Sequence, residues 1–137
     1  MITLAQYVGP HAQSKDWTFE RQKAAMTLLD KVNALCGEMQ SDGLVMQINP
    51  ATRSQISGKT LGGFRPQDAT QGAPNSSHKQ GQGIDLFDPK DTIDAWCVAN
   101  QERLANHGIY IEHPDATKGW CHMTTRAPRS GNRVFMP

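Results

Sequence analysis

The segment from Ser76 to Asp85 places a histidine, His78, and an aspartate, Asp85, at a fixed separation with glycines between them. A second histidine, His122, lies far downstream. Two imidazoles and one carboxylate suit a divalent zinc ion, and three protein ligands leave a fourth position open for water or substrate. We therefore expect a fold that brings these three distant side chains to a single Zn²⁺ ion.

The length of 137 residues fits a single domain with one core, which we place over residues 1–137. The formal net charge is +1, and the charged residues are spread along the chain, so no basic patch indicates a nucleic-acid partner or an anionic membrane surface. The N-terminus lacks the basic and apolar regions of a signal peptide, and no apolar stretch is long enough to span a bilayer. We expect a protein that is soluble and cytoplasmic on synthesis, without membrane insertion.

The chain has three cysteines, Cys36, Cys97 and Cys121, an odd number with no closely spaced pair. Such a set, without a secretory signal, does not indicate a disulfide framework. We expect free thiols, with Cys36 and Cys97 buried as small apolar side chains on helices.

Hydrophobic periodicity predicts two main helices. Over residues 18–39, apolar side chains recur at three- and four-residue spacing, and Asp16 or Thr18 is the expected N-cap. Over residues 88–107, Asp88 is the expected N-cap, with a proline at the first helical position and a glycine after the last one.

Four short segments have strand-like composition, at residues 44–48, 83–87, 109–112 and 120–124. Together with the helices they predict an α+β fold, in which two main helices pack on a small, mostly antiparallel sheet. Within the last segment, side chains alternate between the two faces of a strand. His122 therefore shares a face with Trp120 and Thr124, and Cys121 is expected to pack on the other face.

A long polar segment, residues 51–74, contains Arg65 shortly after a pair of glycines. A loop of this length in a compact domain is more often functional than decorative. A tethered arginine can offer a bidentate fork to a carboxylate. A solvated surface position is the alternative for this side chain.

The motif Ser-x-His-x-x-Gly-x-x-x-Asp, followed by a helix and then Trp-x-His, resembles that of the zinc D-alanyl-D-alanine carboxypeptidases and L-alanyl-D-glutamate endopeptidases. Their superfamily also contains the hedgehog signalling domain, and the chain looks most like its small phage-encoded members. The likeness extends over most of the chain, through residues 63–66, 76–85 and 119–122.

By position, the resemblance implies that His78, Asp85 and His122 bind zinc. It also implies that Arg65 orients a carboxylate or carbonyl of a peptide substrate, and that Ser76 donates a hydrogen bond near the same group. The implied substrate is a peptidoglycan peptide, cleaved next to a D-amino acid.

One position departs from this pattern. Three residues before His122, where active relatives carry an aspartate or glutamate as general base, this chain has Gly119. Glu112 and Asp115 are the nearby carboxylates that could substitute, and Glu112 is favoured over Asp115 because a strand end holds a side chain more firmly than a loop. For either residue, a solvated surface acid is the alternative. Without a base, a rate factor of typically about 10²–10⁴ would be missing.

Two functions follow from these observations. The first is a zinc peptidase that hydrolyses peptidoglycan cross-links for a phage, acting in the host periplasm or from the virion. The second is a zinc-binding structural or binding module of the same fold that has lost turnover, because of Gly119.

Overall fold

A computed structural model describes all 137 residues and shows an α+β fold. None of its helices combines the length and the hydropathy needed to cross a bilayer. The elements are α1 Leu4–Val8, α2 Phe19–Ser41, β1 Gly83–Phe87, α3 Thr92–Ala99, α4 Gln101–His107, β2 Tyr110–Glu112, β3 Trp120–Thr124 and β4 Val134–Phe135, with short 3-10 helices at Gly9–His11, Ser77–Gln80 and Pro114–Ala116.

The four strands form one sheet in the order β1-β3-β2-β4. β3 pairs antiparallel with both β1 and β2, whereas β4 pairs parallel with β2 at the edge. The expectation of a small, mostly antiparallel sheet is confirmed. β4 comes from the C-terminal tail, outside the four segments expected as strands.

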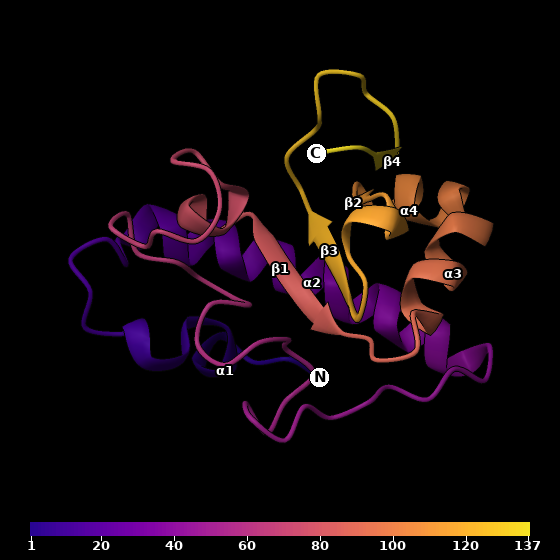
Figure 1. Ribbon diagram of the computed structural model, residues 1–137, viewed down its shortest axis with the longest axis horizontal. Helices are drawn as coiled ribbons and strands as arrows, with labels where there is room; N and C mark the ends of the chain where they lie inside the picture. The colour runs from indigo at the N-terminus through magenta and orange to yellow at the C-terminus, as the bar shows by residue number, and fades with distance from the viewer.

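One face of the sheet forms the core with α2, the long helix capped by the Thr18 side chain as predicted. Ile84, Leu86 and Met123 are fully buried on this face, in one apolar cluster with the buried side of α2. Figure 1 shows α2 running behind β1 and β3. All three cysteines are free and buried, as expected.

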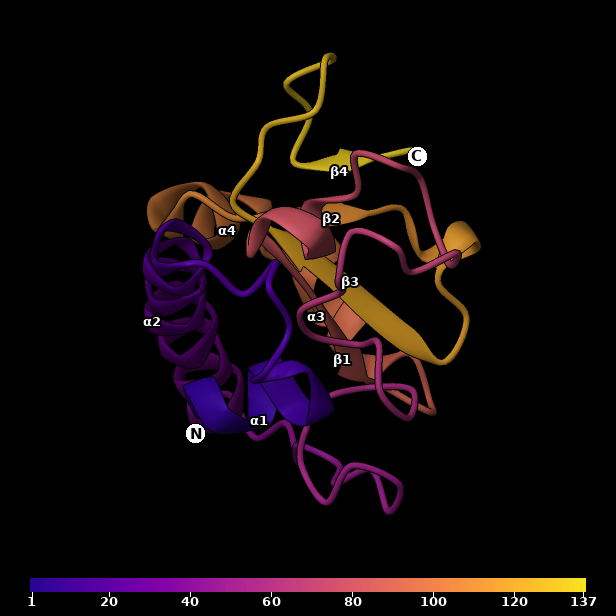
Figure 2. The same ribbon diagram turned by 90° about the vertical axis from the view of Figure 1, so that its left-hand side faces the viewer.

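The opposite face of the sheet lies under the loops of residues 50–75 and under the C-terminal tail (Figure 2). Cys121 is buried in the core, so β3 directs His122 to this second face, as its alternation predicts. The register places His122 opposite Asp85 of β1. The sheet therefore has a core face and a polar face.

The second main helix differs from its prediction in two ways. It begins at Thr92, not at Asp88, although the Asp88 carboxylate still accepts hydrogen bonds from the N–H groups of Ile93 and Asp94, both at 3.0 Å. It is also interrupted at Asn100, whose backbone leaves helical geometry and separates α3 from α4. A side chain can thus cap a helix from outside its first turn.

The prediction of a strand over residues 44–48 was wrong, because the structure has no strand there. Leu44 and Met46 pack against the core, while Val45 and Ile48 are exposed. The alternation of apolar residues in this segment therefore arises because an extended loop buries one of its sides against the core. No neighbouring strand supplies the ladder that a β-strand needs.

Two aspartate side chains hold the connection between β2 and β3, which leads to His122. Asp91 accepts a hydrogen bond from the N–H of Gly119 at 2.9 Å, and Asp94 accepts one from the Thr117 hydroxyl at 3.0 Å. The other oxygen of the buried Asp94 has no hydrogen-bond partner. Burial raises the pKa of Asp94 to about 6; the neighbouring Cys121 and Thr117 side chains lower it, and the nearby charges of Asp88 and Asp91 raise it further.

We predict that Asp94 makes the protein less stable as the pH rises. An unfolded aspartate has a pKa of about 3.9, so between about pH 4 and 6 the folded state binds more protons and loses stability with each added unit of pH. Asp94→Asn should gain roughly 1–2 kcal/mol relative to wild type between pH 4 and pH 7. Urea unfolding at both pH values measures this, with the exposed Asp30→Asn as the matched control. Parallel pH profiles for wild type and Asp94→Asn would contradict the assignment.

Candidate metal centre

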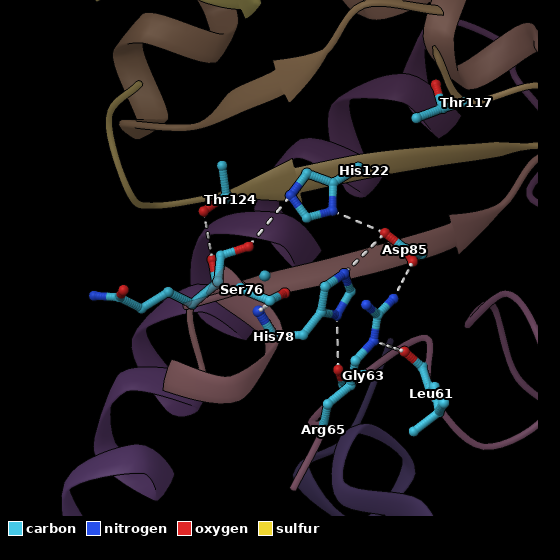
Figure 3. A network of polar contacts seen from close by, with 12 residues as sticks. Leu61, Gly63, Arg65, Ser76, His78, Asp85, Thr117, His122 and Thr124 are labelled. Carbon is cyan, nitrogen blue, oxygen red and sulfur yellow. Dashed lines mark hydrogen bonds and ion pairs between the residues drawn. The ribbon is translucent and has the colours of Figure 1, made fainter. Parts of the chain in front are cut away.

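Three side chains meet at the polar face of the sheet. His78 Nε2 lies 3.1 Å from Asp85 Oδ1, and His122 Nδ1 lies 2.8 Å from the same oxygen. The candidate ligand atoms of the three residues all lie within 4.8 Å of one another. Figure 3 shows the two imidazoles lying one above the other, both directed at the Asp85 carboxylate. The structure thus brings together the three residues that the sequence predicted as metal ligands.

Local structure explains why this motif presents His78. The Ser76 hydroxyl accepts a hydrogen bond from the backbone N–H of His78 at 3.3 Å and so caps the 3-10 helix Ser77–Gln80. The chain then turns at Gly81 into β1, which carries Asp85. At Gly83, a Cβ would lie 2.3 Å from Ser77 Oγ and 3.1 Å from the His122 ring, so only glycine leaves room for the packing around the centre.

The proton positions follow from the acceptors around His78. Its Nδ1 lies 2.8 Å from the carbonyl oxygen of Gly63, and a carbonyl only accepts, so Nδ1 carries the hydrogen. In neutral His78 the lone pair of Nε2 therefore faces Asp85 Oδ1. His78 Nε2 and Asp85 Oδ1 would then both be acceptors, and two acceptors 3.1 Å apart need a proton or a cation between them. This need favours a bound metal ion.

The carboxylate of Asp85 is ionised. Burial opposes its charge, but His78 and then His122 more than compensate and hold the pKa of Asp85 well below its usual range. Its second oxygen, Oδ2, accepts a hydrogen bond from Arg65 Nη2 at 3.2 Å. This leaves Oδ1 for the two imidazoles and any cation between them.

The donor set and its spacing are compatible with zinc. A tetrahedral ion with bonds of about 2.0–2.1 Å separates its ligand atoms by roughly 3.3 Å. The two distances to Asp85 Oδ1, 2.8 and 3.1 Å, would need to expand by only a few tenths of an ångström. His78, Asp85 and His122 would hold the ion and leave a fourth position open.

Arg65 has partners different from those that the family likeness implies. It is buried, and its Nε donates to the carbonyl of Leu61 at 2.7 Å. Its Nη1 donates to the carbonyl of Gln71 at 3.4 Å, and its Nη2 to Asp85. All three nitrogens are thus engaged within the protein, so Arg65 supports a metal ligand, and its contact with substrate stays a prediction.

A cavity of about 830 Å³ opens over the centre. Besides the three candidate ligands, its lining includes Ser76, Arg65, Glu112, Trp120, Phe135 and Arg126. Glu112, one of the two carboxylates considered as general base, therefore lies in the same cavity as the candidate ligands. The other, Asp115, is exposed and does not line the cavity; it lies 3.7 Å from Lys118 and 3.6 Å from His113, and its catalytic role stays a prediction.

Ser77 is a site residue that the sequence did not single out. Its Oγ lies 3.4 Å from His122 Nε2, so Ser77, His122 and Asp85 have the order of a serine-hydrolase triad. However, a triad has no use for His78, which aims at the same Asp85 oxygen. Ser77 is also buried against β1 at Gly83. It is better explained as the group that orients His122, as partners of metal-bound histidines commonly do.

We predict that the protein binds one equivalent of zinc. Free zinc at 100 times its Kd should stabilise the fold by about 2.7 kcal/mol, because only the folded chain assembles the three ligands. Differential scanning calorimetry of the wild-type protein, with and without a chelator, measures this zinc-dependent stabilisation. His78→Ala should lose it, while His113→Ala, whose histidine lies outside the cavity, should retain it. An unchanged melting temperature in wild type would refute the metal centre.

We predict that Ser77→Ala weakens zinc binding by about 10-fold and at most about 100-fold, because the His122 ring loses its orienting partner. Competition with a chromophoric chelator measures the change. Ser57→Ala, which lines the same cavity without a hydrogen bond to any ligand, is the control. If Ser77 instead acted as a nucleophile, its loss would abolish an activity that persists in the chelator, and zinc affinity would not change.

The chain was compared with family models, with curated proteins and with solved structures. None of the three comparisons returned a match.

Proposed function

We propose that the protein is a zinc-dependent peptidase that hydrolyses amide bonds next to D-amino acids in peptidoglycan. The observation that carries the proposal is the convergence of His78, Asp85 and His122 beneath an open cavity. The motif likeness to the small phage-encoded DD-peptidases, and through them to the hedgehog fold, supports the choice of substrate. A phage protein with this activity would act in the host periplasm or from the virion.

The zinc ion, when bound, supplies the Lewis acidity that polarises a carbonyl and acidifies water. The protein must then supply a base. Ile111 of β2 lies opposite Met123 of β3, so the next position of the antiparallel register puts Glu112 opposite His122. Facing residues in such a pair have Cβ atoms about 4.5–5.5 Å apart and point to the same side.

Asp85, His122 and Glu112 therefore form a row across β1, β3 and β2 on the cavity face. We assign Glu112 as the general base. Its carboxylate takes a proton from the attacking water and returns it to the leaving amine as the amide bond breaks. In this assignment Glu112 of β2 supplies the carboxylate that Gly119, just before β3, cannot provide.

The test is cleavage of purified muropeptides by the zinc-loaded protein, with mass spectrometry of the products. We expect new amine and carboxylate termini at a bond next to a D-amino acid, and none with His78→Ala. Absence of cleavage by wild type carrying one equivalent of zinc would refute the peptidase.

We predict that Glu112→Gln lowers kcat by about 10²–10⁴-fold and leaves zinc binding intact, because only proton transfer is lost. Asp115→Asn, which changes a carboxylate outside the cavity, should keep wild-type kcat. Kinetics with a defined muropeptide measure both variants. A Glu112→Gln enzyme with normal kcat would contradict the assignment of the base.

The second candidate function is a zinc-binding structural or binding module without turnover, and Gly119 is the observation that favours it. This glycine has φ of +89°, a conformation that side chains rarely adopt, although a Cβ there would meet no atom within 4 Å. An aspartate at 119 would have space but a strained backbone. This module would bind zinc and lose thermal stability with a chelator, yet leave muropeptides intact.

A further inference from the structure

We propose that Arg126 is the carboxylate-binding group of the cavity, so that the preferred ligands are short peptides with a free carboxylate. The inference rests on the proposed function in one respect, since it takes the cavity over the metal centre as a peptide site. Arg126 stands in the tail beyond β3 and lines this cavity.

The first step concerns the other arginine of the cavity. Each of the three guanidinium nitrogens of Arg65 already donates to an oxygen of the protein, and one of these oxygens belongs to Asp85. Three of the five N–H groups of Arg65 are therefore engaged and its side chain is buried, so turning it toward a ligand would draw it away from Asp85. Leaving a buried carboxylate without its partner is costly. Arg65 is therefore poorly placed to offer a fork to a ligand.

The second step concerns the donors of Arg126. One Nη2 hydrogen bond, 2.7 Å long, joins its guanidinium to the carbonyl of Asn75 in the loop before the His78 motif. The side chain makes no other hydrogen bond, so four of its five N–H groups remain available. The hydrogen bond to Asn75 holds the guanidinium of Arg126 in place, and its remaining N–H groups can still donate to a ligand.

The third step concerns the backbone that positions Arg126. Its N–H donates to the Thr124 hydroxyl at 3.0 Å, and that hydroxyl donates to the carbonyl of Gln82 at 2.8 Å. Gln82 immediately precedes β1, and Thr124 ends β3. The first residues of the tail are thus tied to the two strands that carry Asp85 and His122, which holds Arg126 at a set distance from the metal centre.

The fourth step concerns charge. The charged residues that line the cavity are Lys59, Arg65, Arg126, Asp85 and Glu112. Arg65 and Asp85 pair with each other, which leaves two positive side chains, Lys59 and Arg126, and one negative side chain, Glu112. A divalent metal ion would add further positive charge. A ligand with one negative group is therefore favoured. Lys59 is exposed on a loop, whereas the planar fork of Arg126 matches a carboxylate in shape.

The sequence contained a signal for this residue. Arg126 has the same parity as His122 and Thr124, and the alternation of β3, continued by one step, directs it to the cavity face. Arg129 has the opposite parity, is exposed and does not line the cavity. It is therefore a matched control from the same tail.

The experiment measures binding as well as turnover. Zinc-loaded protein is titrated with N-acetyl-D-alanyl-D-alanine and with its C-terminal amide, and the indole N–H signal of Trp120 in the cavity reports binding by NMR. We expect the acid to bind at least about 10-fold more tightly than the amide, as charge-assisted hydrogen bonds allow. Arg126→Gln should bring the two affinities together, Arg126→Lys should keep part of the difference, and Arg129→Gln should keep all of it.

Thermal melting of each variant confirms that it is folded. Equal affinities for acid and amide in wild type, no binding of either, or an unchanged ratio in Arg126→Gln would each overturn the inference. Absence of muropeptide cleavage would refute the peptidase but leave this ratio untouched, so the two failures are distinguishable. If turnover is observed, Arg126→Gln should raise KM for the acid with little effect on kcat.

Discussion

The buried carboxylate of Asp85 is the interaction on which the rest of the site depends. One oxygen faces the two imidazoles and the other faces Arg65. Its backbone also holds the long loop in place, since its N–H donates to the carbonyl of Gly62 and its carbonyl accepts from Ser57. Removing one partner of a buried ion pair typically costs about 3–5 kcal/mol. The loop, the arginine and both histidines are therefore arranged around a single charge.

The sheet sets the spacing of the chemistry around that charge. Asp85 lies opposite His122, and Glu112 lies opposite Phe135. The β2–β3 register, continued by one residue past the Ile111–Met123 pair, joins these two pairs into one row across the four strands. Each step in such a row is one interstrand spacing, about 4.8 Å. The candidate metal ligands occupy one half of the row, and a carboxylate and an aromatic ring occupy the other. A ligand lying along the row would contact the candidate metal ligands first, then the carboxylate of Glu112, and then the apolar ring of Phe135.

Much of this site could be predicted from the sequence because its signals are local. The alternation of β3 assigns His122 and Cys121 to opposite faces without knowledge of the other strands, and the three candidate ligands lie in two short motifs that resemble those of zinc peptidases. The partners of Arg65 could not be predicted, because they depend on how a polar loop folds onto β1. Nor could the edge strand of the sheet, since a two-residue strand has no periodicity of its own. That Glu112 lines the cavity and Asp115 does not could not be predicted either, because it depends on how the strands pack.

The tail that follows β3 contributes no candidate metal ligand, yet it supplies one wall of the cavity and the outermost strand beneath it. The candidate metal ligands and the residue proposed to bind a carboxylate, Arg126, thus lie on separate stretches of chain. Under that proposal, a change in residues 126–137 would alter the wall of the cavity and leave the three candidate ligands in place.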